Sequence, residues 1–309
     1  MKHKHWREAM FTEMKALMKS NTWVKVAKIN TVRVLFSIAA NKDWPIHQFD
    51  VTNAFLKKRD GKITCLIVYV DDMIITGDDE EEISELRKNL FKEFEMKDLG
   101  LLKYFLGIEV LRSKRRIFIN QRKYILDLLA EIGMIDCKPA DAPIVQNHGL
   151  QLKKGGRQAD RGRYQRLVGK LIYLSHTKPD IAYVVGVVSQ FMHAPQEEHW
   201  EAALRIVRYL KGTPEHRLMF EKHGHMEVHG FTDADWAGNP NDRKSTASYF
   251  TFVGDRHFIK ENIEAKVVEI PYVKSEDQLA DILTKAVNSK SFREIKKVIN
   301  KVFGSYMYL

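Results

Sequence analysis

Continuous apolar runs separated by short polar segments predict strands in the first third of the chain. "ITCLIVYV" (63–70) and "MIITG" (73–77) are two such runs, and only Asp71 and Asp72 lie between them. This pattern predicts a β-hairpin with two aspartates at its bend. "WPIHQFDVTNAFL" (44–56) begins as a further strand, and the Asp60-Gly61 pair predicts a turn before the hairpin.

Apolar residues at helical spacing predict several helices along the chain. The run of five acids from Asp78 to Glu82 resembles a cation site, but acids at a helix N-terminus also interact favourably with the helix dipole, and we adopt that interpretation. The predicted helices lie within residues 5–20, 26–41, 78–96, 121–132, 177–192, 197–212 and 275–286.

Strand candidates recur beside these helices, so the pattern as a whole predicts an α+β fold. "YFLGIEVLRSKRRIFIN" (104–120) reads as two strands joined by a basic turn, and "MEVHGFTDADWAG" (226–238) and "STASYFTFVG" (245–254) are two more candidates. The segment 149–162 is polar, basic and rich in glycine, which predicts a linker.

Composition restricts the partners and the compartment. The chain has 309 residues, 44% of them hydrophobic, and a net charge of +10, which favours a polyanionic partner, nucleic acid first, with ordinary solubilising charge as the alternative. Its two cysteines, Cys65 and Cys137, are far apart, which argues against a zinc module or a disulfide framework. No apolar segment approaches a membrane span and no secretory signal is seen, so we expect an intracellular protein without membrane contact.

The adjacent carboxylates of Asp71 and Asp72 repel one another unless something neutralises them. Divalent cations do so in two-metal sites for phosphoryl transfer, where a third carboxylate from a neighbouring strand completes the site, and Asp50 is placed to supply it. The alternative is an ordinary turn, because aspartate is a common turn residue.

Several segments in this order resemble the reverse transcriptase of copia-type LTR retrotransposon polyproteins. They include "WREAMFTEMKALMKSNTW", "WPIHQFDVTNAFL", "LIVYVDDMIITGDD", "FEMKDLGLLKYFLGIEV" and "YQRLVGKLIYLSHTKPDIAYVVGVVSQFM". The resemblance implies that Asp50, Asp71 and Asp72 bind two Mg²⁺ ions, with Mn²⁺ as a substitute, and activate a primer 3′-hydroxyl toward an incoming dNTP. It also implies that Tyr69 lies beneath the primer terminus.

The same family carries a C-terminal ribonuclease H domain, and "FTDADWAGNPNDRKSTASYFTFVG" resembles part of it. By this resemblance Asp233 is the first acidic metal ligand, with Asp235 as the nearby alternative, and Asp255 matches the last one. The implied organisation is a fingers and palm remnant (1–148), a helical thumb and connection (149–222) and a truncated ribonuclease H-like α/β domain (223–309). The implied partners are an RNA template, a DNA primer, an RNA–DNA hybrid and dNTPs.

Three junctions are shorter here than in the family. Segments are missing between Trp23 and Val26, between Leu56 and Ile63, and between Gly254 and Asp255. The missing parts are a fingers segment, the elements that position template and nucleotide, and the strands with two ribonuclease H acids. Internal deletion or mis-splicing in the gene prediction explains such junctions, and we expect low or no catalytic activity because positioning supplies much of the rate.

Three functions remain open on the sequence. The first is an RNA-directed DNA polymerase with ribonuclease H, weakened by the missing segments. The second is a catalytically silent, basic nucleic-acid-binding remnant, for which Arg205, Arg208 and Lys211 on one helix face suit phosphates and solvent equally. The third is a metal-dependent nuclease that uses only Asp233, Asp235 and Asp255, which lacks further acids. The compartment is the cytoplasm, the nucleus or an organelle, and the oligomeric state is open.

Overall fold

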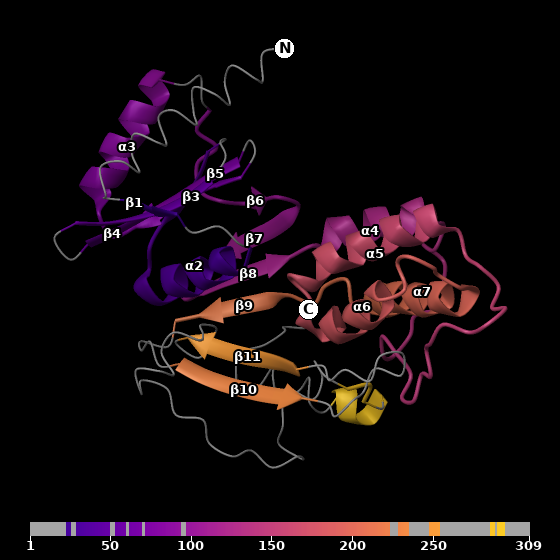
Figure 1. The fold of residues 1–309 in the computed structure, drawn as a ribbon. Coiled ribbons are helices and arrows are strands. Elements are labelled where there is room, and N and C mark those ends of the chain that lie inside the picture. The colour runs from indigo at the N-terminus through magenta and orange to yellow at the C-terminus, as the bar shows by residue number, and fades with distance from the viewer. Residues whose placement is uncertain are drawn as a thin grey trace. The chain divides into compact units, whose positions relative to one another are not determined.

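The chain divides into two compact units, residues 1–106 and 107–309, and each contains helices and antiparallel strands (Figure 1). This mixture confirms the α+β expectation at the level of fold class. The predicted boundaries at 148 and 222 remain predictions. The computed structural model describes residues 23–25, 29–49, 53–59, 62–69, 72–93, 97–222, 228–234, 247–253, 285–287 and 289–293.

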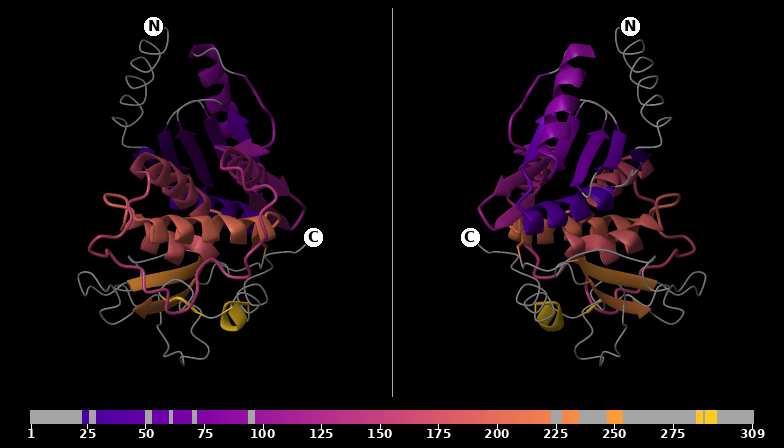
Figure 2. Two further views of the ribbon diagram at one scale, coloured as in Figure 1. Left: turned by 90° about the vertical axis from the view of Figure 1, so that its right-hand side faces the viewer. Right: turned by 90° about the vertical axis from the view of Figure 1, so that its left-hand side faces the viewer.

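The first unit is built on an antiparallel sheet with the order β1-β3-β4-β5-β2. Its strands are β1 (Trp23–Lys25), β2 (Ile46–Phe49), β3 (Asn53–Arg59), β4 (Lys62–Tyr69) and β5 (Asp72–Gly77). Figure 2 shows them side by side in indigo and purple. The predicted hairpin is confirmed as β4 and β5, and Arg59 pairs with Lys62, which leaves Asp60-Gly61 as the two-residue connection that was predicted.

Two helices and a short strand complete the first unit: α2 (Ile29–Lys42), α3 (Glu80–Glu93) and β6 (Tyr104–Phe105). The helix predicted within 26–41 is therefore confirmed. One face of α2 supplies Leu35, Phe36 and Ala39 to the core. The acidic run also begins a helix, as interpreted, because Asp79 Oδ1 accepts the amide N–H of Glu82 at 3.1 Å and three glutamates occupy the first turn of α3.

The second unit combines antiparallel strands, with β10 and β11 in a sheet of their own, with a helical core. Strand β7 pairs with β8, β8 with β9, and β10 with β11. The first pair was predicted and so were β10 and β11, whereas β9 was not. The elements are β7 (Ile108–Arg112), β8 (Arg116–Asn120), α4 (Arg122–Glu131), α5 (Arg161–Ser175), η1 (Pro179–Ile181), α6 (Ala182–Ser189), α7 (Glu197–Gly212), β9 (Leu218–Glu221), β10 (Val228–Ala234) and β11 (Ala247–Val253).

Helices α4 to α7 bury a continuous apolar core whose members recur at helical spacing. The segment 289–293 adds Phe292 to this core, 4% exposed, with its ring edge-on to Tyr209 at 5.7 Å between centroids. The most buried contributors are Ile125, Tyr164, Val168, Leu171, Leu174, Ile181, Val188, Ala203, Ile206, Val207 and Leu210.

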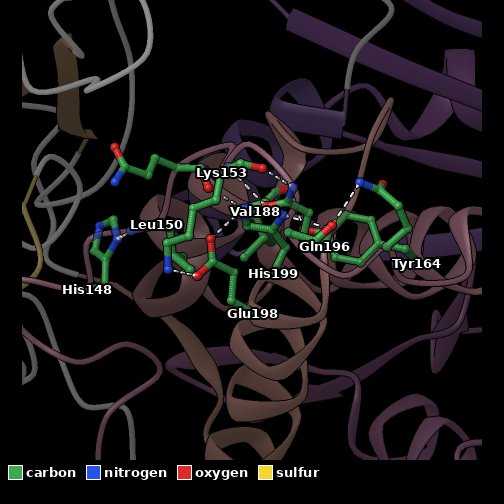
Figure 3. Close-up of polar contacts among 11 residues, drawn as sticks. His148, Leu150, Lys153, Tyr164, Val188, Gln196, Glu198 and His199 are labelled. Carbon is green, nitrogen blue, oxygen red and sulfur yellow. Dashed lines mark hydrogen bonds and ion pairs between the residues drawn. The ribbon is translucent and has the colours of Figure 1, made fainter.

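The predicted linker is irregular up to the start of α5, but its backbone is held to the N-terminus of α7 (Figure 3). The side chain of Gln196 donates to the carbonyl of Lys153 at 2.8 Å and accepts the amide N–H of Lys153 at 3.1 Å. The buried ring of His199 accepts the amide N–H of Gln196 at 2.9 Å and lies 3.3 Å from the carbonyl oxygen of Gln151. A polar, glycine-rich composition therefore does not make this segment a free connection.

Two predicted helices, within 5–20 and 275–286, lie largely or wholly outside the described residues. Among the residues that the structure describes, no helix is both long and apolar enough to span a bilayer.

Candidate polymerase active site

Four strand ends meet at one edge of the first unit's sheet. Asn53 of β3 pairs with Val68 of β4, Val68 with Met73 of β5, and Met73 with Phe49 of β2. These residues form one row across the sheet. The edge just beyond that row therefore contains the end of β2, the start of β3, the end of β4 and the start of β5.

The predicted palm residues are neighbours of this row in the sequence. The structure describes the backbone of two of them, Tyr69 and Asp72. Tyr69 ends β4 and pairs with Asp72, which begins β5 and so belongs to the strand and not to the turn. Asp71 directly precedes Asp72, and Asp50 directly follows Phe49, but both lie outside the described residues. Their predicted roles are therefore untested.

Strand β5 passes through the centre of the first unit's core. Met73, Ile74 and Ile75 are 1% exposed or less, and neighbouring Leu66 and Ile67 of β4 are each 4% exposed. Such a strand is buried on both faces and reads as a continuous apolar run. Burial also raises the pKa of the Cys65 thiol on β4 to about 12, so this cysteine is an inert core residue.

The end of the hairpin opposite the aspartates is closed by Gly77 and Asp78. The amide N–H of Asp78 donates to the carbonyl of Ile63 at 3.0 Å, and its carboxylate accepts the amide N–H of Ile63 at 2.6 Å. A Cβ at Gly77 would lie 2.1 Å from the Ile63 carbonyl oxygen, so only glycine fits there. The acidic-run interpretation did not reveal this second role of Asp78.

Strand β2 is hydrogen-bonded on its other edge as well. The amide of Gln48 donates to the Gly100 carbonyl at 3.0 Å, and the amide of Leu102 donates to the Ile46 carbonyl at 2.9 Å. His47, between them, is half-buried, and its pKa is lowered by burial and by Arg87, against an opposing effect of Asp98. The strand that leads to Asp50 is thus enclosed on both sides.

The predicted ribonuclease H acids are less fully described. Asp233 lies in β10 with its backbone paired to Ser248 of β11, whereas Asp235 and Asp255 lie outside the described residues. Within the described part of the chain, no group of three or more His, Cys, Asp or Glu side chains is arranged to hold a metal ion. That part excludes Asp50, Asp71 and Asp255, so the predicted ligand sets stay predictions.

Two of the three basic residues on α7 make contacts within the chain. Arg208 donates to Glu201 at 3.0 Å, and Lys211 donates to the carbonyl of Cys137 at 2.7 Å. Arg205 is partly buried on the same helix. These contacts favour a structural role for Arg208 and Lys211.

The chain is similar to a reverse transcriptase family model and to transposon polyproteins. The family model described as reverse transcriptase (RNA-dependent DNA polymerase) matches residues 57–146, which include the β4–β5 hairpin. The Retrovirus-related Pol polyprotein from transposon RE1 of Arabidopsis thaliana is 33% identical over 310 residues, covering 79% of this chain and 21% of that polyprotein. The corresponding polyprotein from transposon TNT 1-94 of Nicotiana tabacum is 39% identical over 211 residues, covering 65% of this chain and 16% of its own length.

An uncharacterized mitochondrial protein of Arabidopsis thaliana is 38% identical over 189 residues, which cover 61% of this chain and 78% of that protein. The strand edge with its YVDD hairpin and these matches together define a reverse transcriptase-like protein. The chain belongs to the reverse transcriptase family, in the form found in Pol polyproteins of copia-type transposons.

The chain spans about a fifth of the length of the RE1 polyprotein, 21%. The alignment with RE1 extends over 310 residues although it includes only 79% of this 309-residue chain, so that relative has residues in the aligned span without a counterpart here. No solved structure matches the chain.

Proposed function

We propose that the first unit is a reverse transcriptase palm in which Asp50, Asp71 and Asp72 bind divalent cations, and that polymerase activity is low or absent because positioning segments are missing. The observation that carries the proposal is the row Asn53–Val68–Met73–Phe49, which brings the ends of β2 and β4 and the start of β5 to one edge. The YVDD sequence and the match of residues 57–146 to the reverse transcriptase model support the same assignment.

The donor set suits Mg²⁺, because a hard cation prefers carboxylate oxygen and needs only one or two protein carboxylates in phosphate-transfer sites. Two such cations, when bound, would stabilise the attacking and leaving oxygens of phosphoryl transfer. In the proposal, Asp71 and Asp72 supply the ligands from the hairpin and Asp50 supplies the ligand from β2. Tyr69, the last residue of β4, is proposed to support the primer terminus.

The proposed loss of activity rests on missing positioning. Only Val24 and Lys25 separate Trp23 from Val26, and only residues 57–62 separate Leu56 from Ile63. The family's segments that hold template, primer and nucleotide would have to lie at such junctions, and the RE1 alignment includes residues that this chain lacks. Orientation of the reactants accounts for about 7–11 kcal/mol of a barrier in favourable cases, so a palm without these elements binds metal but reacts slowly.

The proposed partners are an RNA template, a DNA primer and dNTPs, consistent with the family and with the net charge of +10.

Metal binding by the purified chain tests the first part of the proposal. Mn²⁺ titration followed by electron paramagnetic resonance should show bound metal in the wild type and a large loss in Asp71→Asn/Asp72→Asn. Glu80→Gln/Glu81→Gln is the matched control, because it removes two adjacent acids from the start of α3 and should retain binding. A wild type that binds no Mn²⁺, or a control that loses binding equally, would contradict a palm metal site.

Primer extension on an RNA template tests the second part. We expect little or no incorporation with Mg²⁺ or Mn²⁺. Efficient incorporation that disappears in Asp71→Asn/Asp72→Asn would show that the palm is an active polymerase and would overturn the inactivity proposal.

We further propose that residues 223–309 derive from a ribonuclease H domain with Asp233 and Asp255 as remaining metal ligands. The antiparallel pairing of β10 with β11 supports a sheet at this place, with Asp233 on a strand. Two carboxylates make an incomplete two-metal site, so we expect no release of labelled RNA from a hybrid. Release that is lost in Asp233→Asn would contradict this expectation.

A further inference from the structure

We propose that residues 151–156 form an acid-sensitive strap over the start of α7, and that a proton taken up by the buried ring of His199 releases it. The strap runs between two fixed points. Before it, the side chain of Leu150 is buried in the helical core. After it, the carbonyl of Arg157 accepts the amide N–H of Glu197 at 2.9 Å. The device lies in the second unit and needs neither metal nor nucleic acid, so it goes beyond the proposed function.

The strap buries little apolar surface of its own. Residues 151–155 are all exposed, although their backbone lies against the start of the helix (Figure 3). Polar contacts therefore contribute much of the attachment. A segment held in this way opens locally at a lower free energy than a core built from apolar contacts.

Gln196, the N-cap of α7, is the residue to which the strap is attached. Its side chain bonds the backbone of Lys153 in both directions, at 2.8 Å to the carbonyl oxygen and at 3.1 Å from the amide nitrogen. Gly156 lies against the same carboxamide, since a Cβ added to this glycine would come within 2.5 Å of it. Gln196 is 5% exposed, so these contacts are shielded from water. A displacement of Gln196 therefore loosens the strap.

The ring of His199 holds Gln196 in place. Its Nδ1 accepts the amide N–H of Gln196 at 2.9 Å, which leaves the ring proton on Nε2, 3.3 Å from the carbonyl oxygen of Gln151. The ring is fully buried and stacked on Phe191. One neutral imidazole thus contacts the strap directly at Gln151 and indirectly through Gln196.

A second proton on this ring is incompatible with the closed strap. The new N–H on Nδ1 would face the amide N–H of Gln196, so two donors would meet without an acceptor. A buried positive charge would also replace a neutral ring, which is unfavourable. Opening of the strap gives the ring access to water and removes both costs.

The charged groups that face the ring come from the strap and from α7. Burial lowers the pKa of His199, the Gln151 carbonyl and Glu198 raise it, and Lys153 lowers it. Lys153 and Glu198 form an ion pair with one another, so their opposite effects on the ring partly cancel. Because the folded pKa lies below the ordinary 6.5, the closed strap is fully favoured above pH 6.5 and loses stability as the pH decreases.

Two neighbouring titratable contacts do not join the strap to the ring. Arg157 and Glu197 form an exposed ion pair at 2.9 Å, which water screens. The Nδ1 of His148 accepts the amide N–H of Leu150 at 3.1 Å, and burial lowers the pKa of His148 as well. This bond lies within the segment and does not cross to α7, so His148 provides a matched control.

Hydrogen exchange of the full chain, measured by mass spectrometry at pH 7.5 and pH 5.0, tests the proposal. Rates are divided by the intrinsic rate at each pH to give protection factors for peptides from the strap and from α5. The strap contains hydrogen-bonded amides, those of Lys153 and Gly156. His199→Gln keeps an acceptor that cannot titrate, and His148→Gln is the control. Gln196→Ala removes both bonds to Lys153 and serves as the reference for an open strap.

We expect strap protection in the wild type to fall about ten- to thirtyfold between pH 7.5 and pH 5.0, with the upper limit set by an open-state pKa of 6.5. The fall should disappear in His199→Gln and persist in His148→Gln, and α5 should stay much better protected than the strap. A strap that does not respond to pH, the same fall in His199→Gln, or its loss in His148→Gln would each overturn the proposal.

Equal protection of the strap and α5 at pH 5.0 would show global unfolding and would also overturn it. If circular dichroism shows that His199→Gln does not fold, Gln196→Ala decides. Its strap should already be unprotected at pH 7.5, and wild-type protection there would contradict the attachment through Gln196.

Discussion

Asp78 pairs with Ile63 through both its backbone and its side chain, and this double contact closes the β4–β5 hairpin at the end away from the predicted metal ligands. The backbone bond is 3.0 Å long and the carboxylate bond 2.6 Å. Asp78 thus extends the hydrogen-bond ladder between β4 and β5 by one pair, immediately before Asp79, which caps α3. Asp78, although part of an acidic run, therefore has a structural role in closing the hairpin.

Asp78→Ala should lower the free energy of unfolding by about 1 kcal/mol, since it removes one partly solvated hydrogen bond to a charged acceptor. Urea unfolding of the purified chain measures the change. Glu85→Ala, an exposed acid in the middle of α3, is the control and should change stability by less than about 0.5 kcal/mol. Equal effects of the two substitutions would contradict the role assigned to Asp78.

Gly77→Ala should be more damaging, because the new Cβ would lie 2.1 Å from the carbonyl oxygen of Ile63. We expect a loss of about 2–3 kcal/mol from the forced backbone shift. Gly169→Ala is the matched control: a Cβ added to this helical glycine in α5 would meet open space, so alanine should stabilise the chain by about 0.5–1 kcal/mol. Thermal unfolding of both variants distinguishes the expected loss of stability from the expected gain. Unchanged stability in Gly77→Ala would show that the hairpin end can relax.

The β4–β5 hairpin could be predicted because its two apolar runs are continuous and separated by a pair of aspartates, although Asp72 belongs to β5 and not to the turn. Strand β9 could not, since four residues, Leu218–Glu221, carry no clear alternation and pair with β8 about a hundred positions earlier. Likewise, the pattern around Thr76 indicates a buried strand but not the Pro45 carbonyl that its hydroxyl binds. The YVDD hairpin was evident from local sequence, whereas the contacts that hold it come from distant segments.

Lys178 shows the same dependence on distant contacts in the second unit. It is fully buried, and its ammonium group donates to the carbonyl oxygens of Thr213 at 3.0 Å and His216 at 2.9 Å, just after the end of α7. A cation there also interacts favourably with the helix dipole. The turn before η1 is thereby tied to the end of α7.

Lys178→Met should lower the free energy of unfolding by about 2–4 kcal/mol, because the two buried carbonyls lose a charged donor. Lys170→Met is the control, since Lys170 forms a surface ion pair with Glu131, and such pairs contribute about 0–1 kcal/mol. Urea unfolding measures both. Similar losses in the two variants would show that the buried donor contributes no more than a surface pair.

We expect His199 to make the stability of the second unit depend on pH. Its ring is fully buried and stacked on Phe191 at 3.8 Å, and its Nδ1 accepts the amide N–H of Gln196, which requires a neutral ring with its proton on Nε2 (Figure 3). Burial lowers the pKa of His199 below the ordinary 6.5, more strongly than the Gln151 carbonyl and Glu198 raise it, and Lys153 lowers it further.

Because the unfolded chain binds this proton more readily than the folded chain, stability should be full above pH 6.5 and fall as the pH decreases from there toward the folded pKa. His199→Gln removes the titrating ring and should flatten this fall, although burial also lowers the pKa of His148 and His47, so part of the slope will remain. Urea unfolding at half-unit steps from pH 8 to pH 5 measures the slope in both proteins. An unchanged slope in His199→Gln would mean that the cap at the start of α7 tolerates a protonated ring, and the assigned hydrogen-bond direction would then be wrong.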